Sequence, residues 1–403
     1  MNKEDAVIVL TYVYPYPPTD GGKISAATTI QLLAQHYSVH LFCLYEKNEI
    51  PTVSYPPELA GVYIFPAALK NQLFWTHVFR MIRTWIRGEA YTIKKFWSAE
   101  LQQKFAEIYQ ALNKPPIIVE RLAMAQYVEE RSYSLIEQNI ETKLIHRRQQ
   151  VASRMERRVW TIEEKLTQRF EVHALRHACR IMALSPVDRD TIVKEFEIPQ
   201  KRVEFHYPPI MKPWHRSVSR NGARGAVTVI GAVHYRDNEL ALEWFLEEIL
   251  PRLPASVPVI IAGEGTGQIV TRRRLRSRVR LIEQFEDVGD FIDDIEILAV
   301  PLQTAGGIRI KILQALTAGI PIVSTTVGVQ GVAWDQAGIM VDFVSCIMSV
   351  YNNPKNMLER IAIGTEFVDT HLNVQGYDHS LQRLVQASEP TQLKERGLRS
   401  SPN

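Results

Sequence analysis

The residues best suited to chemistry lie in TAGGIRIKILQALTAGIPIVSTTVG, which runs from Thr304 to Gly328. Gly306 and Gly307 follow an apolar run typical of a strand, and Arg309 and Lys311 open the helical pattern that comes next. Cations at a helix start oppose the helix dipole, so they cost stability unless an anion is present. Backbone N–H groups and side-chain cations together suit a diphosphate. The stretch predicts an anion site, and the alternative is a solvated basic helix start.

A second glycine pair, Gly21 and Gly22, stands in YPYPPTDGGKIS, directly after the first apolar run of the chain. The pair lets a ligand approach the backbone closely, and the following helical pattern offers unpaired N–H groups. Lys23 adds a positive charge. The pattern predicts a phosphate contact, with a plain strand-to-helix turn as an equal alternative.

Further polar residues follow other apolar runs. Gly231 ends AVTVIG, and we expect Arg236 and Asn238 just ahead of the next helix, where Asn238 is also a good N-cap. AGEGTG, residues 262–267, is another loop suited to the edge of a nucleotide. His146, in TKLIHRRQQ, is expected at the carboxyl end of a strand, where it can hydrogen-bond a sugar hydroxyl or a leaving phosphate. Most single histidines are structural, which is the alternative.

These residues require a scaffold of alternating strands and helices. Continuous apolar runs alternate with helical patterns along the chain, among them predicted helices over 237–253 and 288–294, which indicates parallel, doubly wound α/β sheets. A Pro-, Ser-, Gly- and Arg-rich stretch interrupts the alternation. We therefore predict two Rossmann-like domains that face each other across a cleft, where open sheets bind ligands. The predicted parts are an N-terminal Rossmann-like domain (1–212), a linker (213–225), a second Rossmann-like domain (226–375), and a helix packing back on the first domain with a flexible tail (376–403).

Bulk properties limit the class of protein. The 403 residues suit two domains of roughly 200 residues each, and 46% hydrophobic residues is an ordinary globular value. No run reaches the ~20 apolar residues of a spanning helix, and the N-terminus lacks a cleavage site. The three cysteines are far apart, so we expect a reducing compartment, the cytoplasm. A net charge of +3 does not indicate nucleic acid as a partner.

Residues 74–97, FWTHVFRMIRTWIRGEAYTIKKFW, interleave arginine and lysine with aromatic and aliphatic side chains. This composition suits a helix that lies on an anionic membrane, or a surface for a lipid-linked acceptor. The favoured interpretation is a helical hairpin whose apolar face packs on the first domain. Peripheral contact with the inner face of the membrane is the alternative.

Three blocks of sequence are similar to a known family. PYPPTDGGKI (15–24), GAVHYRDNELALEWFLEEILPRLP (231–254) and VPLQTAGGIRIKILQALTAGIPIVSTTVGVQGV (300–332) resemble GT-B fold glycosyltransferases of family 4, retaining enzymes that use nucleotide sugars. The similarity is narrower to the bacterial branch linked to polysaccharide assembly. HACRIMALSPVDRDTI (177–192) resembles the family more weakly.

The resemblance implies a role for each candidate residue. Arg309 and Lys311 would neutralise the leaving diphosphate, and His146 would lie near the donor sugar as a third catalytic residue. It also implies that the first domain binds the acceptor and the second the nucleotide sugar. The implied donor is a UDP-sugar, no metal is required, and the acceptor is a glycan, a lipid-linked molecule or a small molecule. The donor-binding residues that it implies are Gly21, Gly22, Gly231, Arg236, Asn238, Gly306, Gly307, Ile308 and Gln314.

Some positions depart from the family's pattern. Position 314 usually holds a Glu that binds the ribose hydroxyls, and the Gln314 amide gives up roughly 1–2 kcal/mol of charge-assisted binding. Gly306 replaces an acidic residue, and Glu283 stands where relatives tend to carry Gly. Two alternatives to a transferase follow: a catalytically silent GT-B protein that binds a glycan or a partner enzyme, and, ranked last, a sugar-nucleotide epimerase.

Overall fold

The protein consists of two compact units. The computed structural model describes residues 5–46, 59–67, 74–128, 131–216, 225–285, 287–304 and 306–389. Unit 1 comprises Met1–Pro209 and Val374–Asn403, and unit 2 comprises Ile210–Asn373. The boundary between Pro209 and Ile210 lies ahead of the predicted linker at 213–225, of which residues 217–224 lie outside the described part.

Unit 1 is built on a parallel sheet with the strand order β3-β2-β1-β4-β5-β6-β7. Its central strands are short apolar runs with every residue of β4 and β5 buried, which is typical of a sheet covered on both faces. The strands are β1 (Ala6–Thr11), β2 (Ser38–Glu46), β3 (Gly61–Ala67), β4 (Ile117–Glu120), β5 (Ser134–Glu137), β6 (Ile181–Ala183) and β7 (Val203–Phe205).

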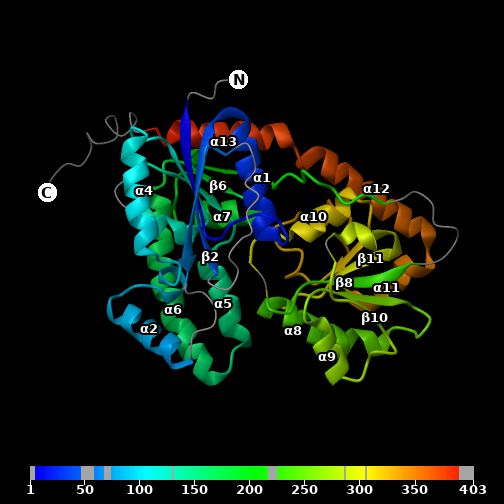
Figure 1. The fold of residues 1–403 in the computed structure, drawn as a ribbon. Helices are drawn as coiled ribbons and strands as arrows, with labels where there is room; N and C mark the ends of the chain where they lie inside the picture. Colours follow the sequence, from blue (N-terminus) through cyan, green and yellow to red (C-terminus); the bar gives the residue numbers. More distant parts are fainter. Residues whose placement is uncertain are drawn as a thin grey trace. The chain divides into compact units, whose positions relative to one another are not determined.

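Helices cover this sheet, with α1 and α4 on opposite sides of the strands (Figure 1). The last helix of the chain, α13, returns to unit 1 and packs on α1 and the central strands, where Tyr377 is fully buried. The predicted tail beyond residue 389 lies outside the described residues. The helices are α1 (Gly21–His36), α2 (Phe74–Ile86), α3 (Tyr91–Lys94), α4 (Ala99–Ala111), α5 (Glu141–Val151), α6 (Arg154–His177), α7 (Pro186–Lys194) and α13 (Val374–Ala387), with 3₁₀ turns at Leu122–Tyr127 and Gln200–Arg202.

Unit 2 has the same alternation of parallel strands and helices as unit 1, built on a smaller sheet. Its parallel sheet has the order β10-β9-β8-β11-β12, and helices such as α9 and α12 lie on its two sides (Figure 1). Its strands are β8 (Ala226–Ile230), β9 (Val259–Ala262), β10 (Arg280–Ile282), β11 (Ile295–Val300) and β12 (Ile322–Ser324). Its α-helices are α8 (Arg236–Trp244), α9 (Thr266–Arg272), α10 (Ile310–Thr317), α11 (Phe343–Asn352) and α12 (Pro354–His371).

Two expected elements of unit 2 are shorter or broken. The predicted helix over 237–253 leaves α-helical geometry after Trp244, passing through a π turn (Phe245–Ile249) and a 3₁₀ turn (Leu250–Arg252). Pro251 lies in the 3₁₀ turn and cannot donate a helical hydrogen bond. The predicted helix at 288–294 is a pair of 3₁₀ turns, Val288–Asp290 and Ile292–Asp294.

The expected packing of residues 74–97 on the first domain holds in part. Ile93 and Phe96 are buried in the core of unit 1, whereas helix α2 exposes one apolar face. Phe79, Ile82 and Ile86 are 67%, 46% and 82% exposed and share a helix face by their spacing. The other side of α2 is anchored, because Trp85 Nε1 donates to Glu163 Oε1 on α6 at 2.6 Å. Within the described residues, no helix has both the length and the apolarity needed to cross a bilayer.

Candidate functional site

The strand order of unit 2 creates a crevice outside the carboxyl ends of β8 and β11. Strands β9 and β10 lie on one side of β8, whereas β11 and β12 lie on its other side, so the direction of strand succession reverses between β8 and β11. Open α/β sheets bind ligands at such a switch point. A pocket lies there. Its lining is Val229, Ile230, Gly231, Asn238, Ala241, Leu242, Ile261, Ala262, Thr266, Pro301, Leu302 and Lys311. Two of the predicted donor-binding residues, Gly231 and Asn238, and the predicted catalytic residue Lys311 therefore meet in one place.

Gly231 is needed because Asn238 occupies the space of a side chain. A Cβ atom at Gly231 would lie 2.8 Å from Asn238 Cγ. Asn238 Nδ2 donates to the Ala232 carbonyl at 3.0 Å, which holds the loop after β8. Asn238 was expected ahead of the helix or as its N-cap. It lies within the first turn of α8, and Tyr235 occupies the N-cap position.

Lys311 places a cation at the floor of the crevice. Its Nζ atom donates to the Ile230 carbonyl at 2.7 Å. Burial, together with the neighbouring Arg309 guanidinium, lowers the pKa of Lys311 to about 8. The ammonium therefore carries its charge in an unfavourable setting, which an anionic ligand would relieve.

Arg309 occupies the N-cap position of α10, where no side chain caps the helix. Its Nη2 atom donates to the Gly307 carbonyl at 2.9 Å, and Gly307 adopts a positive φ of 62°. Gly306 and Ile308 complete this partly exposed loop. The main-chain N–H groups at the start of α10, together with two cations, form the array of donors that an anion requires.

Two other predicted residues of unit 2 have partners of their own. Arg236 Nη1 donates to Glu239 at 2.5 Å on the surface of α8. The Gln314 carboxamide is buried and bonds to the main chain of Lys212 and Trp214. Glu283 Oε1 accepts a hydrogen bond from the Gly267 N–H at 3.0 Å, in the first turn of α9.

Unit 1 has an equivalent switch point at the carboxyl ends of β1 and β4, and it holds a cation that the sequence analysis missed. Arg121 directly follows β4, with its guanidinium 4.1 Å from the centre of the Tyr12 ring and Nη2 3.4 Å from Glu141 Oε1. Its φ is +92°, a strained value of the kind that persists at functional sites. The available signal was the polar pair Glu120-Arg121 closing an apolar strand.

Buried carboxyl groups surround Arg121. Burial raises the pKa of Glu120 to about 7, although Gln138 Nε2 donates a hydrogen bond to Glu120 Oε1 at 2.5 Å. Burial also raises the pKa of Glu171 to about 8 and, with the negative neighbour Glu171, raises that of Glu137. Since Glu120 is partly protonated near neutral pH, it offsets the positive charge of the Arg121 guanidinium only in part.

The glycine pair lies beside this edge. Gly21 and Gly22 begin α1, and a Cβ atom at Gly22 would lie 3.3 Å from the Tyr12 hydroxyl. Asp20 caps the helix by accepting from the Lys23 N–H at 3.0 Å. One helix-start donor is thus already used, which favours a structural role for part of this turn.

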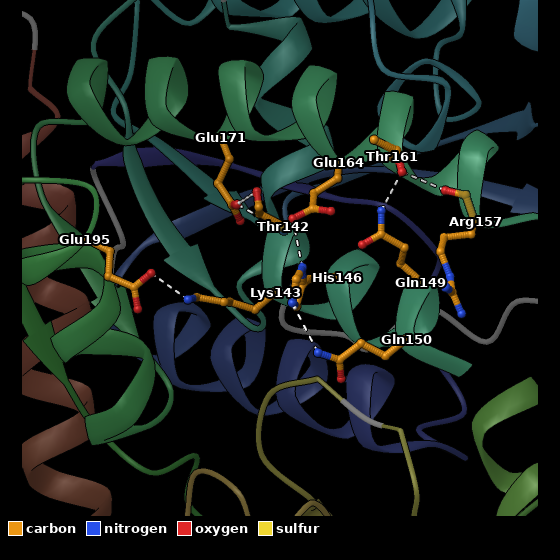
Figure 2. A network of polar contacts seen from close by, with 10 residues as sticks. All are labelled: Thr142, Lys143, His146, Gln149, Gln150, Arg157, Thr161, Glu164, Glu171 and Glu195. Atoms are coloured by element: carbon orange, nitrogen blue, oxygen red, sulfur yellow. Dashed lines mark hydrogen bonds and ion pairs between the residues drawn. The ribbon is translucent and has the colours of Figure 1, made fainter. Parts of the chain in front are cut away.

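His146 is not at the end of a strand, as the sequence analysis expected. It lies in the second turn of α5, because residues 141–151 contain a single apolar pair, Leu144-Ile145, among good helix formers, whereas the buried strand is Ser134–Glu137. Its side chain is 48% exposed, with Nδ1 3.0 Å from Glu164 Oε1 and Nε2 3.2 Å from Gln150 Nε2. Figure 2 shows His146 pointing toward Glu164 of α6.

Comparisons with known proteins agree with this architecture. Residues 224–353 match the family described as glycosyl transferases group 1. No curated protein sequence matches the chain.

Solved structures with two such units resemble the chain over almost its whole length. The sucrose-phosphate synthase of Thermosynechococcus elongatus superposes with a TM-score of 0.70 at 13% identity, over 98% of this chain and 100% of that chain. WaaG, a glycosyltransferase involved in lipopolysaccharide biosynthesis, gives 0.64 at 13% identity, over 93% and 99%. Anabaena HepE in complex with UDP and glucose gives 0.64 at 10% identity, over 95% and 100%. The chain therefore has the GT-B fold, and residues 224–353, within its second unit, match the glycosyl transferases group 1 model.

Proposed function

We propose that the protein transfers a sugar, a hexose, from a nucleoside diphosphate sugar to an acceptor hydroxyl with retention of anomeric configuration. The observation that carries this proposal is the convergence of Lys311, Arg309 and the uncapped start of α10 at the switch point of unit 2. Structures of HepE with UDP and with UDP-glucose support a UDP-sugar as the donor.

The cations explain how the reaction is accelerated. The bond between the sugar and the diphosphate breaks as negative charge develops on the leaving phosphate. Lys311 and Arg309 would stabilise this charge, and the dipole of α10 would add to their effect. A phosphate oxygen of the leaving group would take the proton of the acceptor hydroxyl, so that no protein nucleophile is required.

The acceptor is proposed to bind unit 1, at the carboxyl edge that carries Tyr12 and Arg121. An aromatic ring and a guanidinium provide both stacking and hydrogen bonds for a glycan or another polyhydroxylated acceptor. WaaG acts in lipopolysaccharide biosynthesis, which supports a glycan or lipid-linked acceptor.

Lys311→Ala tests the proposal. The variant should lose transfer activity and bind UDP more weakly, since the buried cation at the diphosphate is removed. Lys355→Ala, which changes an exposed lysine of α12, is the matched control and should behave as wild type. Normal turnover by Lys311→Ala would show that the anion site is not the donor site.

We further propose that the protein is cytoplasmic and touches the inner face of the membrane through α2. The exposed apolar side chains of Phe79, Ile82 and Ile86 share their surface with Arg83 and Arg87, which are also exposed. Apolar groups flanked by cations suit an anionic bilayer surface. Such contact would bring the enzyme to a lipid-linked acceptor.

A further inference from the structure

The carboxamide of Gln314 joins helix α10 to the chain segment at the start of unit 2. Its Oε1 atom accepts from the Trp214 N–H at 3.1 Å, and its Nε2 atom donates to the Lys212 carbonyl at 3.2 Å. The two main-chain groups flank Pro213. They are the pair that one residue of a neighbouring parallel strand would bond. Gln314 thus supplies to residues 212–214 the hydrogen bonds of a missing strand neighbour.

Both halves of the amide are needed for this role. A carboxylate at position 314 would have acceptors only, so one oxygen would face the Lys212 carbonyl without a proton between them. An apolar side chain would leave both main-chain groups without these partners, at a position where Gln314 is only 6% exposed. The amide at this position is therefore explained by the segment that it holds.

The same geometry limits what α10 can offer to a nucleotide. Residues 311 and 314 are one turn apart on one helix face, so a nucleoside that extends from a diphosphate at Lys311 along α10 would meet position 314 next. There the carboxamide is buried and its donor and acceptor are engaged with Lys212 and Trp214.

We infer that Gln314 is a positioning residue that fixes segment 212–214 to α10, and that the donor site does not read the ribose 2′-hydroxyl through this helix. Donors then include 2′-deoxynucleoside diphosphate sugars as well as their ribonucleoside counterparts. This inference rests on the proposed function, because it concerns the donor of the same site.

Calorimetric titration with UDP and 2′-deoxy-UDP tests the donor part. Wild type and Gln314→Met should each bind UDP and 2′-deoxy-UDP with affinities that differ by no more than about threefold. In Gln314→Glu the carboxylate should turn away from the Lys212 carbonyl and become available to the ribose. This variant should bind UDP about tenfold more tightly than 2′-deoxy-UDP, the effect of one good hydrogen bond. A wild-type preference for UDP of about tenfold or more that disappears in Gln314→Met would overturn the inference.

Hydrogen exchange at the Trp214 amide tests the positioning part without a nucleotide. Exchange should be faster in Gln314→Met than in wild type, while the amides of β8 stay equally protected. Unchanged exchange at Trp214 would overturn the positioning role. If wild type binds neither UDP nor 2′-deoxy-UDP, the proposed function fails, and so does the inference about the ribose hydroxyl of the donor. The exchange rate of the Trp214 amide still shows whether Gln314 holds segment 212–214.

Discussion

Lys311 Nζ donates to the main-chain oxygen of Ile230 at 2.7 Å, which joins the first turn of α10 to the end of β8. The carbonyl satisfies one of the three ammonium donors and carries no net charge. In the described part of the chain, the charged group that shifts the Lys311 pKa is another cation, Arg309. A diphosphate in the crevice would therefore meet a positive charge that no carboxylate among the described residues neutralises.

Nucleoside diphosphate affinity should fall as the pH rises above about 8, where Lys311 loses its proton. Below that pH the ammonium is present and the affinity should be level. Above it, each pH unit should weaken binding by up to about tenfold, because binding then requires proton uptake. Calorimetry of UDP binding between pH 7 and 9.5 measures this slope. Lys311→Arg, which stays charged, should remove the decline, and a level wild-type curve to pH 9.5 would contradict the assignment.

The stability of the unliganded protein should respond to the same group with the opposite sign. The pKa of Lys311 is about 8 in the folded protein against 10.5 ordinarily, so the unfolded chain binds more protons between these values. Stability therefore rises with pH across this window. The melting temperature of wild type minus that of Lys311→Met should increase from pH 8 to 10 in calorimetric scans. A constant difference would show that burial does not shift this lysine.

Arg121→Lys should lower kcat/KM for the acceptor by about tenfold or more, since an ammonium cannot both cover the Tyr12 ring and reach Glu141 as the planar guanidinium does. Steady-state kinetics at varied acceptor concentration measures the effect. Arg131→Lys is the matched control, because Arg131 also lies over aromatic rings but precedes β5, at the opposite edge of the sheet. Equal losses in both variants would indicate a general structural effect.

Sedimentation with vesicles should detect membrane contact through α2. Wild type should bind vesicles that contain anionic lipid more tightly than purely zwitterionic vesicles. The double change Phe79→Ser and Ile86→Ser should reduce binding to both kinds of vesicle, because it removes exposed apolar side chains from α2. Leu358→Ser alters an equally exposed apolar residue of α12 and serves as control. Vesicle binding that survives the α2 changes would place the contact elsewhere.

Transfer should not require a divalent metal. Arg309, Lys311 and the start of α10 supply the positive charge that a metal would bring to the diphosphate. Activity after dialysis against EDTA should match that of untreated protein. Loss of activity with EDTA, followed by recovery with Mg²⁺ or Mn²⁺, would contradict this.

Local patterns in the sequence predicted much of the fold. Apolar runs that alternate with helical periodicity indicated two parallel, doubly wound sheets, and both sheets have this form. The glycine pair at 306–307 and the cations Arg309 and Lys311 indicated an anion site at a helix start, and they lie at the start of α10. Such features are readable because strand-to-loop-to-helix transitions depend on residues close together in the chain.

The partners of the key side chains depend on the tertiary structure. Gln314 bonds to residues 100 and 102 positions away, a relationship that no local period reveals. Arg121 reaches Tyr12 because the order of strands puts β1 beside β4. The sequence by itself determined most of the strands, helices and glycine-rich turns, since these follow from local periodicity and backbone preferences. The segment around His146, expected as a strand, is an exception and forms helix α5. Only the tertiary structure decided which charged and amide groups meet, because strand order and burial bring together residues that are distant along the chain.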